Sequence, residues 1–293
     1  MKIVHVITRL ILGGAQENTL ITCEGLAARG HDVVLITGPA IGPEGALFEQ
    51  TKKAKFKTIV IDSMRREINP LIDIPAYKEL KSHLKKIAPD IVHTHSAKAG
   101  ILGRFAANNL KPRPKIIHTV HGLAFHEYQN QFLNRFYIAI EKTAARRTDA
   151  FISVADAMTE KMLAAGLGTA DKFTTAYSAI SDEFFAEIDD EQKKAFREKY
   201  AIAPDATVLV TIARLFELKG HEYIVDSART LAKRYPECIW LFVGDGILKS
   251  QLRRKIVDAG LEKNFRFTGL VLPNTRGSAG MCNNKPENRP RAN

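Results

Sequence analysis

Short apolar runs of high β-propensity alternate with helix-like segments along most of this chain, and this alternation limits its fold more than any other feature. The run Val33–Thr37, for example, ends at Gly38-Pro39. Helix-like segments show apolar residues three to four positions apart, as at Leu20, Cys23 and Ala27. Strands that alternate with helices at this spacing predict an α/β protein, with a parallel sheet covered on both faces.

The first half of the chain carries most of these elements. Strands are predicted at Ile3–Thr8, Val33–Thr37, Thr58–Ile61, Asp90–Thr94, Lys115–Val120, Ala150–Val154 and Lys172–Tyr177. Helices are predicted after Gly14 and at Ile72–Ile87, Ala97–Asn109, Asn130–Arg147 and Asp156–Ala165. We assign residues 1–180 to one doubly wound, Rossmann-like domain.

A second α/β pattern follows an acidic, irregular stretch, residues 181–203, which we assign to a hinge or linker. Its strands are predicted at Thr207–Ala213, Cys238–Val243 and Asn264–Thr268, and its helices at Gly220–Arg234 and Ile247–Ala259. A βαβ unit takes roughly 30 residues, whereas a doubly wound domain usually has about five or six strands. Residues 204–272 are therefore predicted to form an incomplete second Rossmann-like domain.

Residues 273–293 differ from the rest of the chain. They contain no aromatic and no β-branched aliphatic residue. Such a segment cannot bury enough surface to offset its ordering entropy, so we expect a disordered tail.

The net charge indicates which classes of binding partner to expect, and the cysteine content indicates the cellular compartment. The formal net charge of +11 favours anionic partners: nucleotides, phosphates, nucleic acid or an acidic membrane face. Nucleic acid is not expected, because the basic residues are spread out and form no RRM, KH or helix-turn-helix pattern. The 3 cysteines form no CxxC pair, which suits a reducing compartment, and no signal peptide or apolar run of membrane-spanning length is present. We expect a cytoplasmic protein.

The predicted helix segment Tyr77–Lys86 is rich in lysine. Its lysines are Lys78, Lys81, Lys85 and Lys86. They could rest on the anionic inner face of a membrane, although a solvated helix face is the favoured interpretation.

Candidate functional residues of the first domain lie in loops that follow predicted strands, where open parallel sheets bind ligands. Gly13-Gly14 precedes a helix, so a phosphate or sugar could approach its backbone and the helix N-terminus. The alternative is a tight turn that needs glycine, and the pair does not form the GxGxxG fingerprint of dinucleotide sites. His121 directly follows the strand Lys115–Val120 and could project into a cleft.

Further histidines surround His121 in this part of the chain. His93 and His95 end the neighbouring strand, and a structural role is favoured for both; His118 precedes His121 by three positions. No carboxylate or cysteine accompanies these histidines at ligand spacing, so no metal site is predicted.

The second domain offers two cations in one loop. Arg214 and Lys219 follow the strand Thr207–Ala213. A forked guanidinium and a compact ammonium could neutralise a diphosphate, although solvated loops also carry such charges. The sequence Val243-Gly244-Asp245-Gly246 is interpreted as a structural turn.

Taken in order, these motifs resemble the GT-B glycosyltransferases, specifically the retaining family 4, or group 1, transferases. The resemblance rests on Gly13-Gly14-Ala15-Gln16-Glu17, His93-Thr94-His95, Thr119-Val120-His121-Gly122, Ala213-Arg214-Leu215 with Lys219-Gly220, Val243-Gly244-Asp245-Gly246 and Phe267-Thr268-Gly269-Leu270-Val271. It spans residues 1–272 and implies the GT-B fold of two Rossmann-like domains, the second incomplete here.

The resemblance implies transfer of a sugar from a UDP- or GDP-linked donor to an acceptor hydroxyl, with retention and without a metal or other cofactor. It implies that His121 is the catalytic residue beside the donor sugar. The residues implied for the donor diphosphate are Gly13, Gly14, Arg214 and Lys219, and those for the nucleotide base are Leu270 and Val271. Fixed cations at the diphosphate would stabilise the departing charge, and closure of the two domains would exclude water. The acceptor stays open among a glycan, a lipid-linked molecule and a small molecule.

One departure from the family pattern is clear. The family usually carries a Glu-x7-Glu element that holds the donor sugar and nucleotide, but the glutamates past Cys238 are Glu262 and Glu287 alone. We therefore hypothesise a truncated or frame-shifted family member, inactive if the loss removes donor binding. A short variant completed by another chain is the alternative. Two other functions stay open: a different GT-B enzyme such as a nucleotide-sugar epimerase, and a non-catalytic fragment that binds an acceptor or partner.

Overall fold

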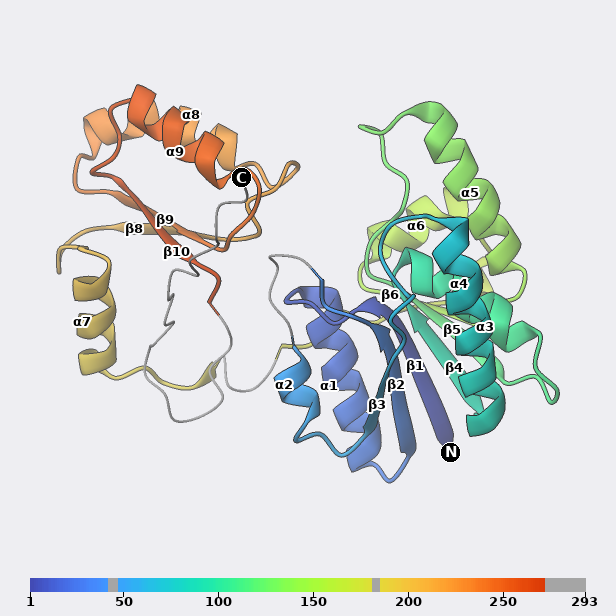
Figure 1. Ribbon diagram of the computed structural model, residues 1–293. Helices are drawn as coiled ribbons and strands as arrows, with labels where there is room; N and C mark the ends of the chain where they lie inside the picture. The colour runs from blue at the N-terminus through green and yellow to red at the C-terminus, as the bar shows by residue number, and fades with distance from the viewer. Residues whose placement is uncertain (42–46, 181–184, 272–293) are drawn as a thin grey trace, which may run out of the picture. The chain divides into compact units, whose positions relative to one another are not determined.

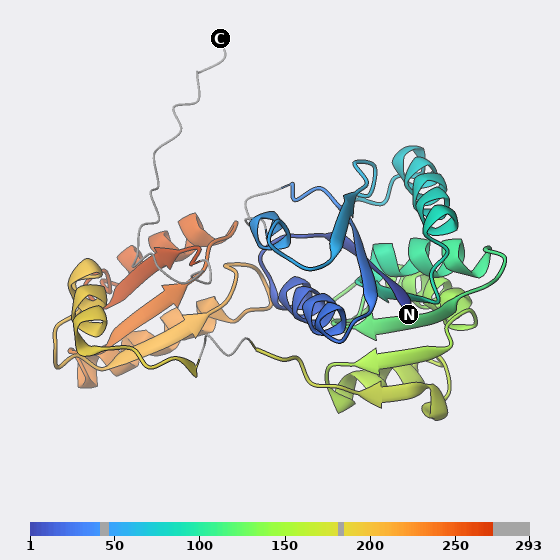
Figure 2. The same ribbon diagram turned by 90° about the horizontal axis from the view of Figure 1, so that it is seen from below.

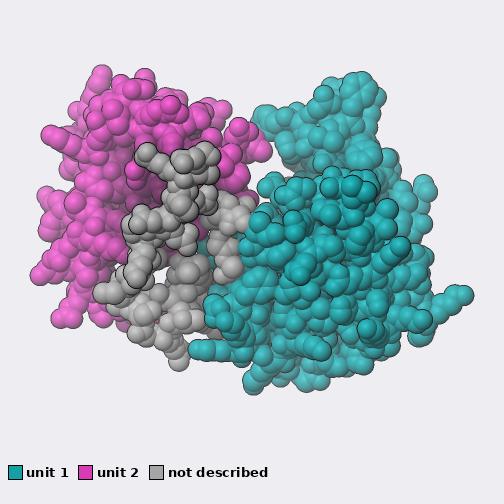
Figure 3. Space-filling model, in the orientation of Figure 1, with its two compact units in different colours: residues 1–184 teal, residues 185–293 magenta. Residues whose placement is uncertain are grey.

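The computed structural model describes residues 1–41, 47–180 and 185–271, which divide into two compact units (Figures 1 and 3). Unit 1 is Met1–Phe184 and unit 2 is Phe185–Asn293. Residues 273–293, predicted as a disordered tail, lie outside the described residues. No helix in the described ranges is long and apolar enough to cross a membrane.

Unit 1 is built on a seven-stranded parallel sheet, so the predicted α/β class is confirmed (Figure 1). Its strands are β1 (Lys2–Arg9), β2 (Asp32–Gly38), β3 (Lys57–Val60), β4 (Ile91–His95), β5 (Lys115–Val120), β6 (Ala150–Ser153) and β7 (Phe173–Thr175). Its helices are α1 (Gly14–Ala28), α2 (Phe48–Thr51), α3 (Pro70–Ile87), α4 (Ala97–Asn108), α5 (Gln131–Ala145), α6 (Asp156–Ala164) and the 3-10 turn η1 (Ala170–Lys172).

The order of the strands creates a switch point at the centre of this sheet. The order is β3-β2-β1-β4-β5-β6-β7, so the chain runs outward from β1 on one side and then from β4 on the other. β1 and β4 pair in register, with His5 opposite His93. The helices that follow these two strands, α1 and α4, pack on opposite faces of the sheet, and open parallel sheets bind ligands at such switch points.

Helices pack on both faces of the sheet, and Figure 2 shows α1 and α3 on opposite sides. Leu80 and Leu84 of α3 pack on one face together with α4. Leu20 and Cys23 of α1 pack on the other. Small residues bring α4 close to the sheet: a Cβ added at Gly103 would lie 2.7 Å from Thr94 Cγ2. The glycine- and alanine-rich sequence of α4 is therefore explained by close packing.

A buried ion pair joins α4 to α5. Arg104 is fully buried, and its Nη2 donates to Glu141 Oε2 over 2.7 Å. Its Nε donates to the Gly100 carbonyl over 2.8 Å. A guanidinium in the interior is tolerated only while its partner neutralises it, so this pair fixes how α5 packs against α4.

Replacing Glu141 by Gln is expected to lower the free energy of unfolding by about 3–5 kcal/mol, because it leaves the buried Arg104 charge uncompensated. Urea denaturation followed by circular dichroism measures this loss. The matched control is Lys52→Gln, which breaks the exposed Lys52–Glu49 pair. Equal, small effects of the two variants would contradict a structural role for the buried pair.

Unit 2 contains a three-stranded parallel sheet with the order β10-β9-β8 in its described residues. The strands are β8 (Val208–Ile212), β9 (Ile239–Val243) and β10 (Phe265–Gly269), and the helices are α7 (Asp190–Lys199), α8 (His221–Arg234) and α9 (Lys249–Asp258). α8 and α9 cover the same face (Figure 1), over a core around Trp240, Phe242 and Phe265. The edge strand β8 exposes apolar side chains, and Ile212 is 80% exposed.

The range 181–203, predicted as a linker, contains the helix α7. Asp189 caps this helix by accepting a hydrogen bond from the backbone N–H of Gln192. Acidic residues fill its first turn and basic residues its last turn, which suits the helix dipole. The helix has no buried residue, so its sequence lacks the apolar periodicity that identified the others.

Candidate functional site

The carboxyl ends of β1 and β4 are tied together by hydroxyl groups. Thr8 Oγ1 lies 2.7 Å from Ser96 Oγ and also accepts a hydrogen bond from the Ala99 N–H over 3.0 Å. Ser96 has a φ of 59°, a conformation that non-glycine residues rarely adopt. This strained junction starts α4 directly at the switch point. Sequence reasoning missed both hydroxyls, although a serine between a strand and a helix is a typical helix-start residue.

The Gly13-Gly14 pair begins α1 at the same edge of the sheet. Gly13 has a φ of 169°, an extended conformation that any residue adopts. A Cβ at Gly14 would meet nothing within 4 Å among the described residues. Neither backbone conformation nor internal packing therefore requires glycine at position 14. The space above Gly14, at the N-terminus of α1, is therefore open among the described residues.

Three histidines form a hydrogen-bonded row beneath this edge. His5 Nδ1 lies 2.9 Å from His95 Nε2, and His95 Nδ1 lies 3.0 Å from His121 Nε2. The ring planes of His95 and His121 lie at 28° to each other, with the ring centroids 5.3 Å apart. His93 packs against the row and is held by Thr119, whose Oγ1 is 2.7 Å from His93 Nε2. The structure thus joins His121, the predicted catalytic residue, to His5, which sequence reasoning had not selected.

The row is neutral at pH 7. Burial lowers the pKa of His5 to about 4, and burial likewise lowers the pKa of the half-buried His121 to about 4. The pKa values of His93 and His95 lie well below the ordinary value because both are buried and neighbouring histidines disfavour added charge. Each ring therefore has one donor and one acceptor nitrogen.

His5, His93 and His95 form a group that could hold a metal ion, since one nitrogen from each lies within 4.8 Å of the others. Neutral imidazoles are good zinc ligands. The sequence predicted no metal here. An ion that used the facing nitrogens of His5 and His95 would have to replace their 2.9 Å hydrogen bond.

His118 does not belong to this row. Its Nδ1 lies 2.9 Å from Thr94 Oγ1, on the sheet face that α4 covers. A Cβ at Gly100 would lie 2.6 Å from His118 Cε1, so the ring packs directly under α4. Burial, and next the Arg104 charge, hold the pKa of His118 well below its ordinary value.

In unit 2, the predicted donor-binding residues lie in loops at the carboxyl edge of the sheet. Arg214 is exposed two residues after β8, and its guanidinium lies 5.0 Å from the centre of the Phe216 ring. Lys219 is exposed just before α8, which begins after Gly220. Both cations are therefore available to an anion at this edge.

The glycines after β9 have a structural cause, in agreement with the interpretation as a turn. A Cβ at Gly244 would lie 2.1 Å from the Ala213 carbonyl oxygen, and one at Gly246 would lie 2.4 Å from that of Leu215. The two loops touch backbone to backbone, and the Leu215 N–H donates to the Asp245 carbonyl over 3.0 Å. This contact fixes the base of the loop that carries Arg214.

The residues predicted to contact the base, Leu270 and Val271, follow β10 at the same edge. Gly269 ends that strand with a φ of 73°, and its carbonyl accepts from the Gly244 N–H over 2.9 Å. Val271 is exposed, whereas Leu270 is half-buried. The structure therefore brings the loops after all three strands of unit 2 to one edge.

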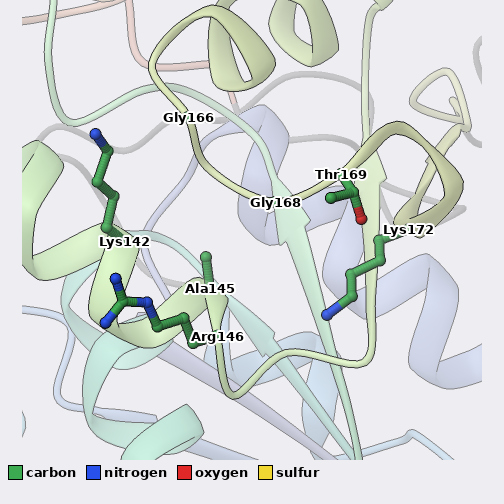
Figure 4. A pocket seen from close by; sticks show the side chains of 7 residues that line it. All are labelled: Lys142, Ala145, Arg146, Gly166, Gly168, Thr169 and Lys172. Atoms are coloured by element: carbon green, nitrogen blue, oxygen red, sulfur yellow. The ribbon is translucent and has the colours of Figure 1, made fainter.

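A cavity of about 410 Å³ in unit 1 lies elsewhere. Figure 4 shows the basic side chains of Lys142, Arg146 and Lys172 around it. These residues end α5 or precede β7, so they lie at the amino ends of the parallel strands. The cavity is thus at the edge opposite to His121, and open parallel sheets bind ligands at the carboxyl edge.

Comparison with known proteins defines the class. Residues 12–184 match the model of Glycosyltransferase Family 4, and residues 192–274 match Glycosyl transferases group 1. The chain is 29% identical over 273 residues to the UDP-Gal:alpha-D-GlcNAc-diphosphoundecaprenol alpha-1,3-galactosyltransferase of Escherichia coli, covering 92% of this chain and 68% of that enzyme. It is 24% identical over 201 residues to the glycosyltransferase EpsD of Bacillus subtilis, covering 68% of this chain and 52% of EpsD.

The fold agrees with this class. The solved structure of Anabaena HepE in complex with UDP and glucose matches with a TM-score of 0.73 at 20% identity, covering 92% of this chain and 70% of HepE. The chain has the GT-B fold and belongs to glycosyltransferase family 4, a family of retaining enzymes, as the sequence predicted.

The buried histidines predict an acid-sensitive fold. Folding lowers the pKa of His5 from 6.5 to about 4. Between these two pH values, His5 is therefore protonated in the unfolded chain and neutral in the folded protein. The free energy of unfolding should therefore fall by about 3 kcal/mol per such histidine between pH 6.5 and 4. Urea titrations at pH 7.5, 6.5 and 5.5 measure the slope, which His5→Phe should reduce. A pH-independent stability over this range would refute the prediction.

Proposed function

We propose that this chain binds a UDP-sugar and transfers the sugar, with retention, to an acceptor hydroxyl, with His121 beside the donor sugar. Membership of family 4 supports the reaction class. The observation that carries the assignment to this site is the neutral His121 at the carboxyl end of β5, joined by hydrogen bonds to the strands that flank the switch point. The UDP in the HepE complex and in the name of the E. coli relative supports the choice of base.

The chemistry needs what these residues offer. As the bond from the anomeric carbon to the diphosphate oxygen breaks, positive charge develops on the sugar and negative charge on the leaving group. A neutral imidazole can hydrogen-bond to a sugar hydroxyl without repelling the developing positive charge, whereas an imidazolium would repel it. Arg214 and Lys219 are exposed cations that can stabilise the departing diphosphate.

The proposal also names the class of acceptor and the cellular location of the chain. The acceptor of the E. coli relative carries an undecaprenol lipid. In the present chain, α3 exposes Lys78, Lys85 and Lys86. We place this chain in the cytoplasm, with a lipid-linked acceptor at the inner face of the membrane.

The role of Arg214 is tested by isothermal titration with UDP, GDP and their sugar conjugates. Arg214→Ala is expected to weaken UDP binding 10- to 100-fold, about 1.4–2.7 kcal/mol, through loss of a charge-assisted contact to phosphate. Arg229→Ala, an exposed arginine on α8, is the matched control. Unchanged affinity of the Arg214→Ala variant for UDP would show that Arg214 does not contact the donor. Tighter binding of GDP than of UDP would show that the donor carries guanine instead of uracil.

The Gly14→Ala variant, which adds one methyl group, tests the role of Gly14. Gly14→Ala should lower sugar transfer at least 10-fold by filling the space above the helix N-terminus, while the free energy of unfolding stays constant or rises by up to about 1 kcal/mol. Gly25→Ala, in the interior of the same helix, adds a methyl group away from the site and serves as the control. Transfer is measured by release of UDP and by mass spectrometry of the product. A product epimer of the donor without transfer would favour the epimerase alternative.

A further inference from the structure

We propose that His95 and His5 are positioning residues that fix the tautomer of His121, so that His121 presents Nδ1–H to the substrate as a hydrogen-bond donor. The inference rests on the proposed function in one respect, the placement of His121 at the donor sugar. The row itself is a feature of unit 1 alone.

Two proton arrangements satisfy both hydrogen bonds of the row. In the first, His5 Nδ1–H donates to His95 Nε2, and His95 Nδ1–H donates to His121 Nε2, so the remaining proton of His121 is on Nδ1. In the second, every proton is on the opposite nitrogen, and His121 turns a lone pair outward from Nδ1. A neutral imidazole has one proton, so the state of one ring determines the next.

The buried end of the row selects the first arrangement. His5 is fully buried, and its Nε2 has no hydrogen-bond partner among the described residues. The first arrangement leaves a lone pair there, and the second leaves an N–H. Buried N–H groups without a partner are rare in proteins, and acceptors without a partner are tolerated more often. His5 Nε2 is therefore deprotonated, and the choice passes along the row to His121.

The surroundings hold the row in place without competing for its protons. His93 donates to or accepts from Thr119 Oγ1, so this histidine makes its own hydrogen bond. The centroid of its ring lies 4.3 Å from that of the His95 ring and 4.7 Å from that of the His5 ring. This close packing restricts rotation of both rings. In the described part of unit 1, no carboxylate hydrogen-bonds to any of the three rings. The orienting group of His121 is thus another neutral imidazole.

At the outer end, His121 Nδ1 makes no hydrogen bond within the described residues. The ring is half-buried, and it lines a small recess together with Ser96 and Gly122. An N–H held in this position can donate to a sugar hydroxyl or ring oxygen of the donor. Preorganised donors of this kind need no reorientation during the reaction.

Two substitutions at one position separate the two hydrogen bonds. The side-chain amide of Asn in His95→Asn can reach the place of Nδ1, which keeps a contact to His121 and loses the one to His5. The amide of Gln in His95→Gln reaches the place of Nε2, which keeps the contact to His5 and loses the one to His121. His93→Gln, at an equally buried histidine outside the row, is the control for disturbed packing.

The tautomer is read from long-range nitrogen–proton spectra of the ¹⁵N-labelled protein, with the His121 signals assigned by their loss in His121→Asn. The wild type and His93→Gln should show His121 protonated on Nδ1, whereas His95→Asn, which loses the link to His5, should show both tautomers of His121. His95→Gln should show a mixture of tautomers, and the kcat for sugar transfer should fall 10- to 100-fold with little change in KM.

An Nε2-protonated His121 in the wild type would overturn the proposal without any variant having to fold. A His121 that stays protonated on Nδ1 alone in both His95→Gln and His95→Asn would overturn it as well. The spectra are recorded without substrate, so they test the tautomer by themselves. A wild-type chain with the expected tautomer that transfers no sugar would instead refute the proposed function.

Discussion

The pairing of β1 with β4 at the centre of unit 1 is the constraint on which the site depends. It sets His5 opposite His93 in register and brings His95 within 2.9 Å of His5. The same pairing places Thr8 against Ser96, so that α4 begins at the switch point. A shift of one residue would turn the histidines to the other face. The register of these two strands thus determines both where α4 begins and which side chains lie at the switch point.

Burial gives these histidines a different role from that of exposed ones. An exposed imidazole titrates close to physiological pH, whereas His5 and His121 have pKa values of about 4. They stay neutral at physiological pH. In the proposed function, neutrality suits them as directed donors and acceptors beside a sugar that acquires positive charge. Their burial also couples the pH dependence of the row to the stability of the sheet.

The sequence predicted the strands of both sheets and the family, because apolar runs and loop motifs are local signals. It placed Gly14, His121 and Arg214 after strands, and the structure shows all of them at carboxyl edges. It missed α7, whose helix is stabilised by capping and charge rather than by an apolar face. It also missed His5 and Ser96. Their partners are about ninety positions away along the chain, and only the strand order of the folded sheet reveals such a contact.

The edge of unit 2 has a consequence for handling the protein. β8 pairs with β9 on one side, while no described strand pairs with its other side, and its exposed side chains include Leu209, Val210 and Ile212. An apolar strand with open backbone groups is a template for adding another strand. Pairing of two copies along this strand would lower colloidal stability as the protein concentration rises. Solubility should accordingly depend more on this one strand than on the net charge of +11.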